Sequence, residues 1–147
     1  MKKIDKLCRL SWQHRRILLY AFVIINAIRL SLWLFSFGVI RQQLKKIMSA
    51  WTCSLQTQKV AILFIVQAVT IVANYSPGTV KCLVRALTTQ LLLNRYRYPH
   101  GLHIGVTKND GQELEAHAWI EYRGQVIVGE LSNLDQFQTL AVGGVKI

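Results

Sequence analysis

The chain has 147 residues, of which 52% are hydrophobic and 17% are charged, so it is long and apolar enough for a packed domain and is not a disordered tail. Its net charge of +11 is unevenly distributed, because residues 1–50 hold ten Lys or Arg against the single acid Asp5, a charge of +9, which leaves +2 for residues 51–147. An anionic partner would therefore meet mainly the N-terminal third.

The three cysteines, Cys8, Cys53 and Cys82, are too few for a disulfide framework, and no CxxC spacing suggests a structural zinc site. A zinc set built from Cys82, His100, His103 and His117 would draw its ligands from scattered elements without compact spacing. We therefore expect a reducing, cytoplasmic compartment, and neither a metal nor another cofactor.

Residues 17–40 are the most apolar stretch and predict one helix long enough to span a bilayer. An Arg at mid-membrane, here Arg29, costs roughly 2.5–3.5 kcal/mol, so a spanning helix is allowed but not required. Asn26, Arg29 and Ser36 form a thin polar stripe, which favours a helical layer packed on the core over a membrane anchor. Basic residues that flank the apolar run make membrane surface contact through residues 17–46 the alternative, and nucleic acid is not an expected partner.

Apolar residues at helical intervals predict a second helix over residues 56–74. The punctuating segment 75–79 offers Ser76 or Thr79 as the N-cap of a third helix. In either case Cys82 falls in the opening turns of that helix, which continues through Leu92.

Beyond residue 98 the pattern changes to strands, predicted over residues 102–107, 115–122 and 125–130, with an edge strand over 140–147. Turns are expected at 109–111 and at Arg123-Gly124. The sequence thus predicts an α+β fold with a helical, basic and apolar region over residues 1–55. Residues 56–147 then form a core in which a helix bearing Cys82 packs on an antiparallel sheet.

The order of Cys82, His117 and Glu130 is that of a cysteine-dependent acyl-transfer enzyme. A thiolate is the attacking form of cysteine, and the start of a helix favours an anion, as does the neighbouring Lys81. An imidazole, here His117, accepts the thiol proton and returns it to the leaving amine. If Arg123-Gly124 is a two-residue turn, His117 lies opposite Glu130, with Cβ atoms about 4.5–5.5 Å apart, so that the carboxylate orients the imidazole.

Three motifs carry a family resemblance: Cys-Leu-x-Arg-Ala-Leu at 82–87, Leu-His-Ile-Gly-Val at 102–106 and His-Ala-Trp-Ile-Glu at 117–121. In this order they resemble the lasso-peptide leader peptidases, the transglutaminase-like family of microcin-processing proteins. The resemblance implies a papain-like or transglutaminase-like core with Cys82 as nucleophile and His117 as base. The family acid is commonly Asp, so Glu130 departs from the pattern and Asp135 is the second choice.

The resemblance also implies a cysteine peptidase that removes the leader from a ribosomally synthesised precursor peptide. Its expected partners are that precursor, a small leader-binding recognition protein and an ATP-dependent lasso cyclase. Arg85 and Trp119 are candidate substrate-binding residues, although a structural salt bridge for Arg85 and a core position for Trp119 are the simpler interpretations. A side chain of the 74–79 loop could complete an oxyanion hole. Two other functions stay open: a transglutaminase-like acyl transferase or amidase, and a non-catalytic, membrane-associated peptide-binding scaffold.

Overall fold

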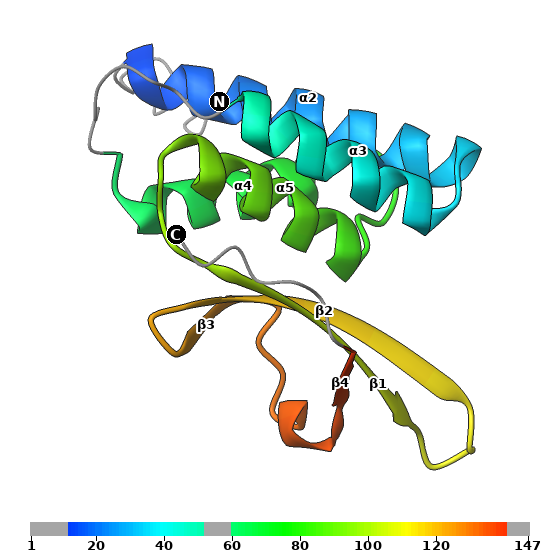
Figure 1. Ribbon diagram of the computed structural model, residues 1–147. Coiled ribbons are helices and arrows are strands. Elements are labelled where there is room, and N and C mark those ends of the chain that lie inside the picture. The colour runs from blue at the N-terminus through cyan, green and yellow to red at the C-terminus, as the bar shows by residue number, and fades with distance from the viewer. Residues whose placement is uncertain (1–11, 52–59, 141–147) are drawn as a thin grey trace.

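The computed structural model describes residues 12–51 and 60–140, which form a helical layer on top of an antiparallel sheet (Figure 1). The helices are α2 (Trp12–Leu34), α3 (Phe37–Ala50), α4 (Ile62–Tyr75) and α5 (Cys82–Arg95). The strands are β1 (Gly101–Lys108), β2 (Leu114–Tyr122), β3 (Gln125–Val128) and β4 (Gln138–Leu140), with the short 3-10 helix η1 (Leu134–Gln136) before β4. The predicted α+β class is confirmed.

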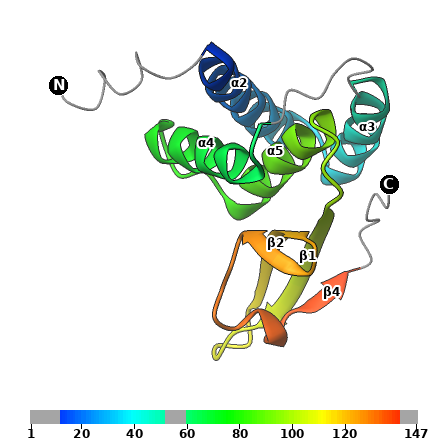
Figure 2. The ribbon, with the colours of Figure 1, turned by 90° about the vertical axis from the view of Figure 1, so that its left-hand side faces the viewer.

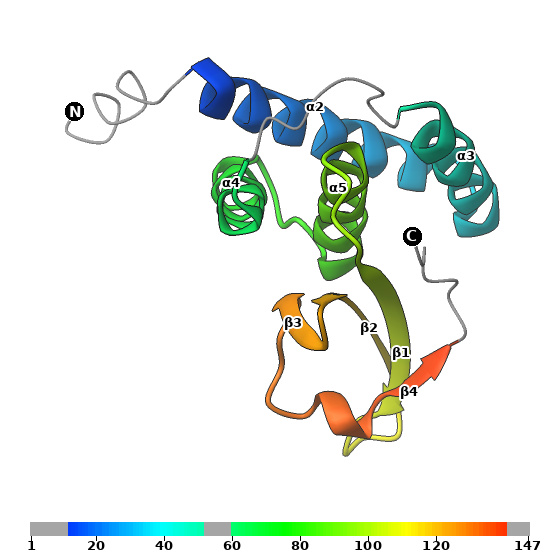
Figure 3. The ribbon, with the colours of Figure 1, turned by 60° about the vertical axis from the view of Figure 1, so that its left-hand side comes forward.

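The N-terminal apolar stretch is divided between two helices, so the prediction of one helix over residues 17–40 is wrong. Helix α2 ends at Leu34, and Ser36 has the extended angles φ −69° and ψ 151° before α3 begins at Phe37. Serine is a favoured residue at the N-cap of a helix, although the side chain of Ser36 makes no capping hydrogen bond. The two helices consequently diverge, and α3 turns away from the line of α2 (Figure 3).

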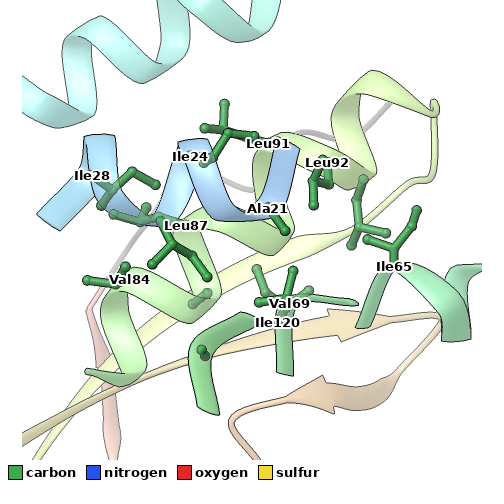
Figure 4. Packing of buried hydrophobic residues seen from close by; sticks show 14 of the residues in the cluster. Ala21, Ile24, Ile28, Ile65, Val69, Val84, Leu87, Leu91, Leu92 and Ile120 are labelled. Atoms are coloured by element: carbon green, nitrogen blue, oxygen red, sulfur yellow. The ribbon is translucent and has the colours of Figure 1, made fainter. Parts of the chain in front are cut away.

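Helix α5 is the centre of the molecule, with ten of its 14 residues buried. Its Leu87 and Leu91 meet Ile24 of α2, and on the other side the core continues to Ile120 of β2 (Figure 4). Helix α2 contacts both α4 and α5. One hydrophobic core therefore joins the N-terminal helices to the sheet, and the predicted boundary between residues 55 and 56 lies outside the described residues.

The second predicted helix is confirmed from Ile62 onward as α4, whereas residues 56–59 lie outside the described part of the chain. The third is confirmed as α5, but its N-cap is Lys81 and neither Ser76 nor Thr79. Ser76 instead ends α4, where its hydroxyl donates to the Val72 carbonyl at 2.7 Å. The loop between α4 and α5 therefore provides both the C-cap of α4, Ser76, and the N-cap of α5, Lys81.

The four strands are ordered β3-β2-β1-β4, all antiparallel. The first turn is closed by the Asn109 side chain, which accepts hydrogen bonds from the Gly111 and Glu113 amides. Arg123 and Gly124 form the second turn with φ of 50° and 79°, the left-handed geometry of a two-residue hairpin. The first two predicted strands are confirmed; the third ends at Val128, and the predicted edge strand lies, beyond residue 140, outside the described residues.

The register between β2 and β3 changes within the hairpin. Tyr122 pairs with Gln125 and Glu121 with Val126, as predicted, but Ile120 then pairs with Val128 because a bulge intervenes. The predicted alignment of His117 with Glu130 is therefore wrong. At Gly129 the chain leaves the strand with φ of +81°, a conformation that side chains disfavour.

Candidate active site

A pocket of about 460 Å³ opens between α4, the start of α5 and the end of β3. Its polar lining comes from Thr70, Cys82, Arg85, His117 and Glu130, and Gly129 also lines it. Its apolar wall consists of Val66, Val69, Val80, Ile127 and Val128. The fold thus brings the three predicted catalytic residues to one cavity, together with Arg85, whereas Trp119 does not line it.

Cys82 is the first residue of α5 and a free, half-buried thiol. The first amides of a helix have no partner within the helix, so they point toward whatever lies at its start. These donors and the positive end of the helix favour negative charge at that position. Cys82 therefore has the placement that a thiolate nucleophile requires.

The loop that leads to Cys82 is held by α2. Arg29 donates a hydrogen bond from Nη1 to the Pro77 carbonyl at 2.7 Å. Its guanidinium also lies 3.1 Å from where a Cβ on Gly78 would be, and Gly78 has φ of +76°. Arg29, a charged residue in the apolar helix α2, thus holds the loop that precedes α5. Its place in the sequence did not reveal this role.

His117 is oriented by a backbone carbonyl. Its Nε2 lies 2.7 Å from the Gly129 oxygen, and because a carbonyl only accepts, Nε2 must carry the proton. In the neutral ring Nδ1 is then left with its lone pair, which is the form that accepts a proton from a thiol. The tautomer is therefore fixed by a backbone carbonyl and not by a carboxylate. In the sequence, the one sign of this arrangement is Gly129, the glycine before Glu130.

An aromatic stack supports His117 from the side. The ring centroid of Trp119 lies 6.3 Å from that of His117 and 5.5 Å from that of His103, with interplanar angles of 16° and 15°. Glu121 accepts a hydrogen bond from Trp119 Nε1 at 3.1 Å, and its other oxygen lies 3.3 Å from His103 Nε2. Trp119 is 5% exposed and its ring stacks on that of His117, and Glu121 ties the stack together.

Arg85 lies one turn after Cys82 and reaches toward α4. Its Nη2 donates to Asn74 Oδ1 at 3.2 Å, and its Nε is buried with no hydrogen-bond partner in the part of the chain that the structure describes. The salt bridge considered for this residue is replaced by a hydrogen bond to an amide. The Nε donor of this pocket-lining cation is therefore buried and unsatisfied among the described residues.

Some predicted partners do not touch. Within residues 12–51 and 60–140, no hydrogen bond joins the thiol of Cys82 to the ring of His117, and catalytic hydrogen bonds are often long before substrate binds. Glu130 and Asp135 are both exposed, and neither carboxylate pairs with His117 in this part of the chain. Residues 12–51 and 60–140 contain no cluster of three His, Cys, Asp or Glu side chains suited to a metal ion.

A cysteine at a helix start and a histidine on an antiparallel sheet, meeting at one cavity, define a site for cysteine-dependent acyl chemistry. The family model of the transglutaminase-like superfamily matches residues 24–142, from within α2 to beyond β4. The chain belongs to this superfamily, whose members are in general cysteine peptidases and transferases. No curated protein and no solved structure shows a significant match to the chain.

Proposed function

We propose that this protein is a cysteine peptidase that removes the leader from a ribosomally synthesised lasso-peptide precursor. The observation that carries the proposal is the shared pocket of Cys82 and His117, with His117 Nε2 bonded to the Gly129 carbonyl and Nδ1 left as the base. Peptidase or transferase chemistry is what the superfamily supports. The substrate class rests on the motifs at 82–87, 102–106 and 117–121, which resemble those of the leader peptidases.

The reaction needs only these side chains and water. His117 Nδ1 accepts the Cys82 proton, the thiolate attacks the carbonyl carbon at the leader–core junction, and the C–N bond breaks to leave a thioester on the leader. The imidazolium returns its proton to the departing amine, which frees the core. His117 then deprotonates a water that cleaves the thioester, releasing the leader acid and restoring the thiol.

The start of α5 supplies the first oxyanion donor in this scheme. The Cys82 amide precedes the first helical turn and is a natural donor to the tetrahedral oxygen. A second donor would come from residues 74–79, where Arg29 holds the loop at Pro77. Arg85 lines the pocket, and its guanidinium would contact a carbonyl or carboxylate of the bound peptide.

Two partners complete the proposed pathway. A small leader-binding protein would present the precursor, and an ATP-dependent lasso cyclase would consume the product. Cleavage creates the free amine that ring closure by amide formation requires. The core peptide with its free N-terminal amine is therefore the substrate of the cyclase.

The direct test is to incubate the full chain with the precursor and the leader-binding protein and to weigh the products. The parent should yield leader and core, and Cys82→Ala should lose activity by about 10⁴-fold or more while keeping its melting temperature. Iodoacetamide should label Cys82 before Cys8 or Cys53, because an activated thiolate reacts first. Cleavage by Cys82→Ala at the parent rate would overturn the mechanism.

The role of Glu130 is tested separately, because its carboxylate lines the pocket but does not hold His117. Glu130→Gln should slow turnover by up to about tenfold, through loss of a negative charge near the imidazolium. Asp135→Asn is the matched control, since Asp135 lies in η1 and not among the pocket residues. An unchanged rate in Glu130→Gln would remove the acid from the mechanism, and a slower Asp135→Asn would transfer the role to that residue.

A transferase or amidase is the second candidate, because the superfamily includes transferases. It would pass the same thioester to an amine or would release ammonia from a side-chain amide. Ammonia release and a mass gain with added amine, without cleavage of the precursor backbone, would favour it. Binding of precursor with no turnover, and labelling of Cys82 no faster than of Cys8, would favour a non-catalytic scaffold.

A further inference from the structure

The surface of α2 that points away from α4 and α5 is mainly apolar, with Gln13 and Arg15 exposed in its first turn. Six of its side chains are 55–82% exposed: Trp12, Leu19, Val23, Leu30, Trp33 and Leu34. We call these residues the outer face of α2. Single exposed apolar residues are ordinary on protein surfaces, but a continuous row along a whole helix marks an interaction surface.

The apolar surface continues onto α3. A groove of about 420 Å³ lies between the two helices and is lined mainly by apolar side chains, among them Val23, Phe35, Val39 and Ile47. The polar residues of this lining are Gln43 and Ser31, whose hydroxyl donates to the Ala27 carbonyl at 2.8 Å. On α2 itself, Asn26 Nδ2 donates to the Phe22 carbonyl at 2.8 Å. The surface is therefore apolar with few polar side chains.

The charge of this region indicates what the cover is. Residues 12–50 hold six Lys or Arg and no acid, and Lys45 and Lys46 are exposed on α3. Trp12 and Trp33 stand exposed near opposite ends of a helix about 34 Å long at 1.5 Å per residue. An apolar face of this length that carries exposed tryptophans, in a basic region of the chain, suits the boundary between lipid headgroups and acyl chains.

We propose that the outer face of α2, with the adjoining groove of α3, binds the surface of an anionic lipid bilayer. The tryptophans and leucines would enter the headgroup boundary, and the basic residues would meet lipid phosphates. An acidic protein partner would satisfy the charge but would not require so long an apolar face. The bilayer satisfies both features.

The helix would lie in the membrane surface and not cross it. By length and composition α2 could span a bilayer, with a mean hydropathy of 2.0. However, its other face is buried in the core, where Ile17, Ala21 and Ile25 have no exposed surface, and Arg29 is bonded to Pro77. The sheet lies on the far side of the helical layer from α2 (Figure 2), so the pocket of Cys82 would stay on the aqueous side.

The test is sedimentation of the full chain with vesicles of phosphatidylcholine alone or mixed with phosphatidylglycerol. Binding should be about tenfold or more tighter to the anionic vesicles, and added salt should weaken it. The double variant Leu30→Gln/Trp33→Gln should bind about tenfold or more weakly. Leu114→Gln is the matched control, because Leu114 is 74% exposed but lies at the far end of a sheet hairpin, and it should bind like the parent.

Each other outcome overturns the proposal. Equal binding of the parent and the double variant would exclude the outer face, and failure of the parent to bind vesicles would exclude the bilayer. A parent dimer that dissociates in the double variant, without vesicle binding, would assign the face to protein association. Protection of an N-terminal tag from protease added outside the vesicles would instead indicate a spanning helix. None of these measurements depends on peptidase activity.

Discussion

The helical layer and the sheet fix their functional side chains by different means. Cys82 is placed by the start of α5, a helix whose position is set by apolar packing on nearly all sides. His117 is placed by one hydrogen bond to a backbone carbonyl and by ring contacts with Trp119 and Phe137. Changes in the helical layer should therefore appear first as lost stability, and changes around His117 first as lost activity.

The largest expected effect on stability tests the helical half of this comparison. Ile25 of α2 is fully buried, and its replacement by Ala should lower the free energy of unfolding by about 2–5 kcal/mol, through lost burial and a cavity. Leu30→Ala, on the outer face of the same helix, should change it by about 0.5 kcal/mol or less. Denaturant unfolding of both variants measures the contrast. Similar losses would mean that the outer face is covered within the folded protein.

The next effect tests the sheet half. A Cβ on Gly129 would lie 2.6 Å from the Ala118 carbonyl, so Gly129→Ala must shift the backbone whose oxygen holds His117. We expect kcat/KM of precursor cleavage to fall by about tenfold to a hundredfold, because a base misplaced by about 1 Å loses such factors. A changed pH–rate profile should accompany the loss, since the imidazole tautomer is no longer held.

Gly124→Ala is the matched control for that change. Gly124 has φ of +79°, close to the +81° of Gly129, but a Cβ there meets nothing within 4 Å. Gly124→Ala should lose about 1 kcal/mol of stability from backbone strain, and Gly129→Ala should lose more because of its clash with the Ala118 carbonyl. Only Gly129→Ala should lose activity. Equal activities would show that the Gly129 carbonyl does not orient His117.

The elements of both layers were predictable because each carries its own local pattern. Apolar spacing located α4 and α5, and the change to alternating residues located β1 and β2. The Arg123-Gly124 turn was predictable because a left-handed pair before a strand favours glycine. Cys82 at a helix start followed from the punctuation at residues 75–79, although the true N-cap is Lys81.

The features that were not predictable depend on contacts between elements. The bulge between Ile120 and Glu121 shifts the register by one residue, and no local pattern in β3 announces it. Gly105 pairs with His117, and its missing side chain leaves room for the ring of Trp119 and the Cβ of Phe137. These are long-range packing facts, so the sequence indicated that His117 needs an orienting group but not that a carbonyl supplies it.

The smallest effect concerns His100, which lies at the junction of the two layers and combines both kinds of constraint. It is buried, its Nδ1 donates to the Tyr98 carbonyl at 2.8 Å, and its Nε2 has no partner among the described residues. Burial lowers the pKa of His100 below its ordinary 6.5, and the bond to Tyr98 opposes this only in part. The folded chain therefore favours the neutral ring more than the unfolded chain does.

The sign of the pH dependence follows from that difference. As pH falls through 6.5, the unfolded chain takes up a proton at His100 before the folded chain does, so the free energy of unfolding decreases toward the lowered pKa. His100→Asn retains a donor for the Tyr98 carbonyl but does not titrate, so it should unfold with a flatter pH dependence over this range. Denaturant midpoints measured above and below pH 6.5 give the comparison. Parallel curves for the parent and His100→Asn would mean that His100 binds its proton equally well in the folded and the unfolded chain. The surroundings of His100 would then be polar, unlike the apolar core around α5.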